Sequence, residues 1–187
     1  MIISTMSFIR NMKNIIAPLI AIVFLINGAF AQTKIVKAKV TFQIKNLGIN
    51  TNGSFNTIHA NIEFDPANLA TSTIEATADV NSVFTDNDTR DEHLRSDEFF
   101  DAARYPKITI RSVSLKHKSG NNYSGQFNVT MKDKTKAFEI PFSYVPTANG
   151  GAFKGSFKLN RRDFGVGSSS LVLSNDATVS IELEIAK

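Results

Sequence analysis

The chain has 187 residues, no cysteine and no tryptophan, and a formal net charge of +4 at neutral pH. Without cysteine it can form neither a disulfide nor a lipid-modified cysteine anchor. The small positive charge gives little support for a nucleic-acid-binding protein, because the basic runs are short and fall at predicted turns or strand ends. We expect these runs to be solvated hairpin ends: Lys116-His117-Lys118, Lys132 to Lys136, and Arg161-Arg162.

Residues 1–31 have the pattern of an export signal. Arg10 and Lys13 supply the positive charge, residues 15–26 the apolar segment, and Ala-Phe-Ala a small-residue cleavage site before Gln32. The apolar segment is shorter than the roughly 20 residues that span a bilayer, so a membrane anchor is the weaker interpretation. The sequence therefore predicts an exported protein, periplasmic or secreted.

Residues 32–187 have the size of one domain with one core. From residue 36 onwards apolar and polar residues alternate, which is the period of a half-buried β-strand. Turn signals separate the alternating segments, the first of them at residues 50–54, where Asn52-Gly53 is a strong hairpin signal. Eight strands are predicted, over residues 36–45, 58–64, 74–80, 108–115, 123–131, 138–144, 153–159 and 177–185.

Two predicted strands contain irregularities. In the fourth, the apolar parity changes between Ile110 and Val113, which predicts a β-bulge near Arg111 and Ser112. In the sixth, Pro141 removes one backbone donor and is tolerated only at a sheet edge or a bulge.

Between the third and fourth strands, residues 89–106 carry charges and paired aromatics. Asp88 or Thr89 is expected to cap a helical turn that runs to Leu94, and Ser96 to cap a second turn. Phe99 and Phe100 are too large to stand exposed together without a function. We interpret this crossover as a lid or plug.

Each predicted strand has one apolar face, and a single helical insert is too little to cover a sheet. The sheet is therefore expected to close on itself as an all-β, eight-stranded antiparallel barrel with a short helical crossover between strands three and four. Such a barrel is either filled by side chains or holds one slender ligand. Small inward residues such as Ala76, Ala78, Gly125 and Gly155 favour unfilled space, but they would also suit the taper of a packed barrel.

The crossover also carries a recognisable pattern. It reads RD-any-HLR, then FF, then YP, and resembles the signature of the YceI-like, polyisoprenoid-binding family of exported bacterial proteins. The resemblance extends to short motifs on either side and covers nearly all of residues 32–187. It implies a lipocalin-like barrel whose apolar interior holds a long-chain amphiphile, with no catalysis as a general role. The matching residues are Arg90, Asp91, His93, Leu94, Arg95, Phe99, Phe100, Tyr105 and Pro106, with Lys45, Leu47, Gly48, Gly53, Phe55, Thr135, Lys136, Asp163, Phe164 and Gly165 outside the crossover.

Strand parity and this resemblance together predict a lipid-binding pocket with a charged mouth. Arg90, His93 and Arg95 are placed at the mouth or lid, where the arginines either meet a lipid head group or lock the crossover to the rim through ion pairs, the structural role being favoured. The expected pocket residues are Phe42, Ile44, Phe55, Ile62, Phe64, Ala76, Val80, Phe84, Leu94, Phe99, Phe100, Ile110, Phe127, Val129, Phe138, Ile140, Phe157 and Phe164.

The residues needed for catalysis are scarce. The chain has three histidines and neither an HExxH nor a Gly-x-Ser-x-Gly motif. His59 and His117 are expected at the surface, and the acidic residues around His93 cap helical turns more plausibly than they bind a divalent cation. We therefore predict no enzyme, no catalytic residue, no metal and no cofactor other than a bound lipid.

A ligand held mainly by apolar contacts has to be long. Burying one methylene contributes about 0.8 kcal/mol, whereas association costs roughly 4 to 15 kcal/mol before any net affinity appears. The predicted partner is a polyisoprenoid, an isoprenoid quinone or a fatty-acyl compound, held for transport or storage, with no nucleic acid; transient membrane contact and a homodimer are both compatible with this role. The alternative is a packed barrel that acts as a structural or partner-binding, stress-related periplasmic protein.

Overall fold

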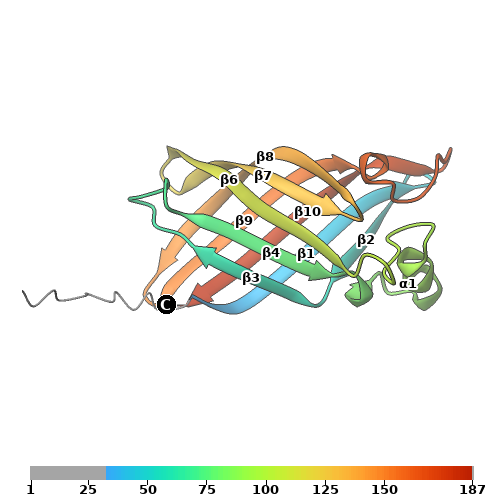
Figure 1. The fold of residues 1–187 in the computed structure, drawn as a ribbon, viewed down its shortest axis with the longest axis horizontal. Coiled ribbons are helices and arrows are strands. Elements are labelled where there is room, and N and C mark those ends of the chain that lie inside the picture. The colour runs from blue at the N-terminus through green and yellow to red at the C-terminus, as the bar shows by residue number, and fades with distance from the viewer. Residues whose placement is uncertain (1–32, 187) are drawn as a thin grey trace, which may run out of the picture. The chain divides into compact units, whose positions relative to one another are not determined.

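The computed structural model describes residues 33–186, which lie in one compact unit, Ala31–Lys187 (Figure 1). The expected export signal, residues 1–31, falls outside the described residues. The elements are β1 (Lys34–Asn46), β2 (Ile49–Phe55), β3 (Ile58–Glu63), β4 (Thr73–Asp79), η1 (Val80–Ser82), β5 (Val83–Phe84), α1 (Asp88–Arg95), β6 (Lys107–Ser119), β7 (Asn122–Met131), β8 (Lys134–Thr147), β9 (Gly150–Asn160), η2 (Arg161–Phe164) and β10 (Leu173–Ala186).

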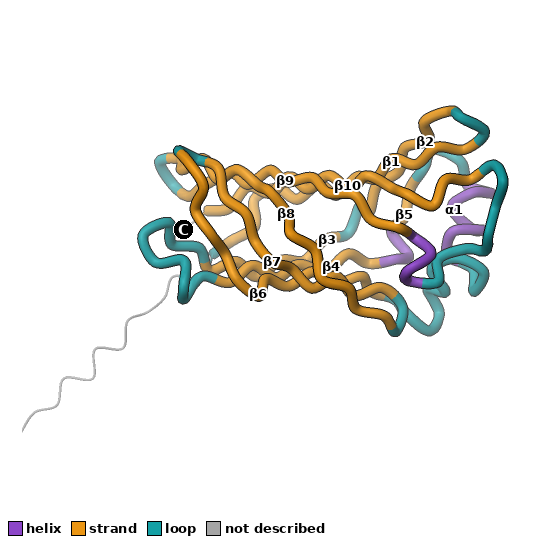
Figure 2. The backbone as a smooth tube through the Cα atoms, turned by 90° about the horizontal axis from the view of Figure 1, so that it is seen from above, coloured by secondary structure: helices purple, strands orange, loops and turns teal. Residues whose placement is uncertain are grey.

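All the strands of the described chain belong to one antiparallel sheet, which curls into a half-barrel (Figure 2). Its order is β3-β4-β6-β7-β8-β9-β10-β1-β2-β5. The all-β, lipocalin-like architecture and the helical crossover, now between β4 and β6, are confirmed. The predicted count of eight strands is wrong, because there are ten. Full closure is also wrong, since no ladder joins the two edge strands β3 and β5 within the described residues.

The first additional strand, β2, arises because the hairpin turn lies earlier than expected. Leu47 and Gly48 both have positive φ, 52° and 78°, as a tight hairpin turn requires. Gly53 instead lies inside β2, directly opposite Phe42. A Cβ at Gly53 would lie 2.2 Å from the ring of Phe42, so this glycine makes room for an aromatic ring and does not form a turn.

The second additional strand, β5, has only two residues and so carries no alternation that a sequence could reveal. It pairs with the end of β2, where Val83 faces the core and Phe84 faces outwards. The helix that follows is capped by Asn87, whose side chain accepts from the backbone N–H of Arg90, one residue before the expected cap. Ser96 ends this helix and does not begin a second one.

The two predicted irregularities are both present. The β6–β7 register shifts between Ser112 and Ser114, which confirms the bulge and leaves Val113 exposed. The β8–β9 ladder includes only Phe142 to Thr147 of β8. The residues of β8 up to Pro141 therefore pair with β7 alone. Pro141 thus sits where its strand becomes a local edge.

We predict that Gly53→Ala lowers the free energy of unfolding by about 1–3 kcal/mol, because the new methyl group overpacks the ring of Phe42. Urea unfolding would measure the loss. In a Phe42→Leu background the same glycine substitution should cost much less. An equal loss in both backgrounds would contradict the role assigned to Gly53.

Candidate functional site

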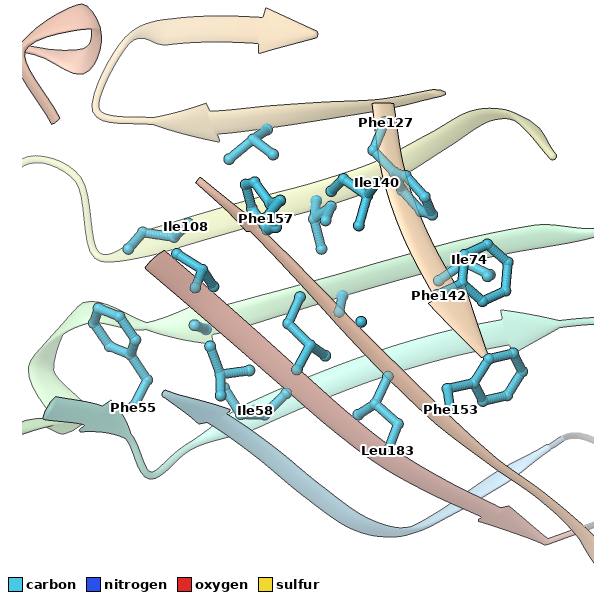
Figure 3. A pocket seen from close by; sticks show the side chains of 18 of the residues that line it. Phe55, Ile58, Ile74, Ile108, Phe127, Ile140, Phe142, Phe153, Phe157 and Leu183 are labelled. Atoms are coloured by element: carbon cyan, nitrogen blue, oxygen red, sulfur yellow. The ribbon is translucent and has the colours of Figure 1, made fainter. Parts of the chain in front are cut away.

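The inward faces of the strands enclose a cavity of about 120 Å³, called here the inner cavity. Aliphatic and aromatic side chains from β1 to β4 and from β6 to β10 form almost all of its wall, and Figure 3 shows them converging on a common space. Small residues at Ala76 and Ala78 leave room between the larger ones. The space is apolar, and such cavities stay dry unless a ligand fills them.

A second cavity of about 230 Å³, the mouth cavity, lies towards the end of the sheet that carries α1. The crossover contributes Leu94, Phe99 and Phe100 to its wall. Rings of Phe42, Phe55 and Phe100 stand in sequence, with centroids 5.7 Å apart in each successive pair. The two cavities therefore lie end to end and share five wall residues: Phe42, Phe55, Ile108, Met131 and Val179.

The far end of the inner cavity is closed by aromatic packing. Phe64 contacts the rings of Tyr123, Phe142, Tyr144 and Phe153, with centroid distances of 4.8 to 6.1 Å. These side chains belong to the largest buried cluster of the described chain. Access to the inner cavity is therefore easier from the mouth than from this end.

Arg161 is the most unusual residue at the mouth. It is only 4% exposed, and burial lowers the pKa of its guanidinium group. Its Nε donates to the carbonyl of Ser174 at 2.9 Å and its Nη1 to the carbonyl of Val166 at 2.8 Å. No ion pair of the described residues includes it, so carbonyl dipoles alone compensate the charge.

The expectation that Arg161 is solvated is therefore wrong. Asn160 caps η2 by accepting from the backbone N–H of Arg162, and this short helix directs Arg161 inwards while Arg162 stays exposed. Lys132 also departs from its predicted solvated role, because its Nζ donates to the carbonyls of Phe99 at 3.0 Å and Gly165 at 3.1 Å. It ties the crossover to the loop after η2.

Arg90 locks the start of the crossover. Its Nε donates to the hydroxyl of Thr85 and its Nη2 to the carbonyl of the same residue, both at 2.7 Å. The Thr85 hydroxyl in turn donates to buried Asp91 at 2.5 Å. This network supports the structural interpretation of Arg90, which also contributes to the wall of the mouth cavity.

The other two residues predicted for the mouth, His93 and Arg95, differ in whether they line a cavity. His93 lines the mouth cavity, lies 2.8 Å from Glu98, and meets the ring of Phe99 edge-on at 4.8 Å. It thereby helps to orient Phe99. Arg95 lines neither cavity.

The end of the crossover depends on Asp101, which is 3% exposed and has a φ of 55°. Its carboxylate accepts from Arg104 Nε at 2.6 Å, and its backbone carbonyl accepts from the N–H groups of Arg104 and Tyr105. The hydrogen bond from Arg104 holds the pKa of Asp101 below its ordinary value of 3.8, although burial opposes the effect.

Most of the residues predicted for the pocket line one of the two cavities. Parity identifies the face of a strand but not the depth along it, so Ile62 and Phe64 are buried in a packed cluster instead, and Phe138 is partly buried against two clusters. Val80 and Phe164 are also buried, but they lie in η1 and η2, where strand parity does not apply. Phe84 is outside the pocket because the two-residue strand β5 turns it outwards. The predicted residues that line a cavity are Phe42, Ile44, Phe55, Ala76, Leu94, Phe99, Phe100, Ile110, Phe127, Val129, Ile140 and Phe157.

The prediction also missed wall residues. Several had the correct parity and could have been included: Ile58, Ile74, Phe142, Phe153, Ile181 and Leu183. Arg161 is different, since two consecutive arginines before an Asp-Phe-Gly turn gave no indication that the first would be buried.

The described residues contain no group of three or more histidine, aspartate or glutamate side chains placed to hold a metal ion. None of their helices has the length and apolar character needed to cross a membrane.

Three comparisons place the chain among known proteins. The profile of the YceI-like domain matches residues 32–185. A UPF0312 protein of Vibrio cholerae is 30% identical over 169 residues, which cover 84% of this chain and 89% of that protein. The crystal structure of BcnA from Burkholderia cenocepacia is 25% identical with a TM-score of 0.76, over 80% of this chain and 96% of that one. A polyisoprenoid binding domain from Saccharophagus degradans is 14% identical with a TM-score of 0.68, over 83% and 97% of the two chains, and this likeness shows the fold alone.

We predict that Asp101→Asn lowers the thermal unfolding midpoint at pH 7. The folded-state pKa of Asp101 is depressed, so its stabilisation is present above the ordinary pKa of 3.8 and is lost as the pH falls through the folded-state value. Unfolding measured from pH 7 to pH 2 should show the two midpoints converging at the acid end. The exposed Asp133→Asn is the charge-matched control; a constant difference for Asp101→Asn at every pH would contradict the ion pair.

Proposed function

Because this chain belongs to the YceI-like family, we propose that it is a lipid-binding protein that holds one long-chain amphiphile, with the tail in the inner cavity and the polar end in the mouth cavity. The main support for this proposal is that an apolar cavity lies end to end with a mouth cavity whose wall contains the buried cation Arg161. It is a binding role, and we assign no residue to catalysis.

The balance between the free energy gained by apolar burial and the free-energy cost of association favours a slender, flexible ligand. At about 25 cal/mol per Å² of buried apolar surface, a long chain gains enough to exceed the cost of association, whereas a small sugar or single ring does not. Met131 stands in both cavity walls, and its unbranched thioether adapts to irregular occupants.

The choice among lipid classes draws on the relatives. A structural neighbour with the same fold is described as a polyisoprenoid binding domain, which supports a polyisoprenoid or isoprenoid quinone beside a fatty-acyl compound. Arg161 suits a polar end that carries an acidic or carbonyl oxygen, because such groups accept charge-assisted hydrogen bonds. Transport or storage of such a compound is the proposed role.

The sequence of the leader supports export to the periplasm or the medium. We predict that the exported form begins at Gln32, since Ala29 and Ala31 place small residues at the cleavage site. N-terminal sequencing of the exported protein would test this. Recovery of only the full-length chain in the inner-membrane fraction would contradict it.

We predict that Ala76→Phe abolishes lipid binding, because the added ring fills the inner cavity. Native mass spectrometry of the purified protein would show whether the lipid adduct disappears, and thermal unfolding would show whether the chain stays folded. Ala137→Phe adds the same ring at an exposed position of β8 and should keep the adduct.

The alternative of a packed barrel makes the opposite prediction. In a filled core Ala76→Phe would cost roughly 1–3 kcal/mol or more through overpacking, and the parent protein would carry no lipid. A stable variant that still binds lipid would place the ligand elsewhere.

A further inference from the structure

Two loops beside the mouth cavity expose large aliphatic side chains. The first is the β1–β2 turn, with Leu47 and Ile49, and the second precedes β10, with Leu171 and Val172. These four side chains are 48% to 106% exposed. Together they are called the rim patch.

The two loops are joined to each other and to the mouth. The backbone N–H of Leu47 donates to the carbonyl of Val172 at 2.8 Å. Asn46 pairs with Leu173 across one ladder and with Ile49 across the other. Since Asn46 and Leu173 both line the mouth cavity, the rim patch lies at its border.

Leu47 is poorly suited to its own position. Its φ of 52° is a conformation that disfavours a branched side chain and that asparagine or glycine adopts more readily. The side chain is 72% exposed, so it gains little from burial in return. The turn needs this backbone conformation but not a leucine, so the exposed side chain is a candidate for a role outside folding.

The loops also carry no charge, although the exposed serines at residues 168–170 precede Leu171. No charged residue occurs in residues 46–50 or in residues 164–175. The second loop is held at both ends, because Arg161 donates to the carbonyls of Val166 and Ser174. Leu171 and Val172 therefore lie between two anchored points of this loop. By contrast, Val36, Val113 and Val145 are exposed singly on strands, which is ordinary for a protein surface.

We propose that the rim patch inserts into the interfacial region of a lipid bilayer, so that the mouth cavity faces the membrane. Uncharged aliphatic loop tips next to an apolar opening fit the acyl boundary better than a flat protein surface, because they project and carry no charge to desolvate. This docking surface rests on the proposed lipid-binding function, since an insoluble ligand has to pass between bilayer and cavity.

The test uses residues 32–187, which contain the whole compact core and exclude the apolar leader. Co-flotation with phosphatidylcholine vesicles is compared for the parent chain, Leu47→Asn/Leu171→Ser, and the control Val36→Ser/Val113→Ser. The rim variant should lose on the order of tenfold in partition coefficient for each leucine removed, and the control should match the parent. Salt should have little effect on binding of the parent.

Two further readouts separate docking from folding and from lipid binding. Leu47→Asn alone should raise the unfolding midpoint, because asparagine tolerates the positive φ, so a loss of vesicle binding would not reflect unfolding. Native mass spectrometry should show that the rim variant keeps its bound lipid. A parent that floats without carrying lipid would support docking while contradicting the proposed function.

Three results would overturn the docking proposal. One is a parent chain that does not float with the vesicles, and another is a rim variant that floats as well as the parent. The third is a patch that instead joins two copies of the chain, seen as a concentration-dependent dimer in light scattering that the rim substitutions abolish, with no vesicle binding.

Discussion

The interior depends on polar contacts that hold the crossover over one end of the curled sheet. Arg90, Thr85 and Asp91 fix its beginning, and Lys132 ties its middle to the loop after η2. Without this cover the inward aromatic face of the sheet would meet water at the α1 end. The crossover therefore covers the apolar face at this end, and it supplies Phe99 and Phe100 to the wall of the mouth cavity.

Much of this arrangement could be predicted from the sequence, because a period of two determines which face each strand buries. The all-β class, the crossover and the bulge in β6 follow from that periodicity. Asn52-Gly53 misled the prediction because a glycine opposite an aromatic ring looks the same in sequence as a glycine in a turn. Arg161 could not be predicted, since its burial depends on how the loop after η2 folds back to offer its carbonyl groups.

At the site, too, the local sequence pattern predicts which side chains face inwards but not how side chains from different strands pack together. Parity identified most of the side chains that face inwards, but the division of the interior into packed ends and two cavities depends on how rings from non-neighbouring strands meet. Phe64 closes one end through contacts with residues of β7, β8 and β9. The interior is thus filled where aromatic residues gather and open beside Ala76 and Ala78 of β4, which gives the proposed ligand one direction of entry.

The most direct test of this account is to determine the structure of residues 32–187 with the lipid that co-purifies from the native source. Continuous ligand density should run from the inner cavity past Met131, with the polar end of the ligand within hydrogen-bonding distance of Arg161. Ligand density outside the curled sheet, or lipid-free protein from the native source whose interior is filled by its own side chains, would contradict it.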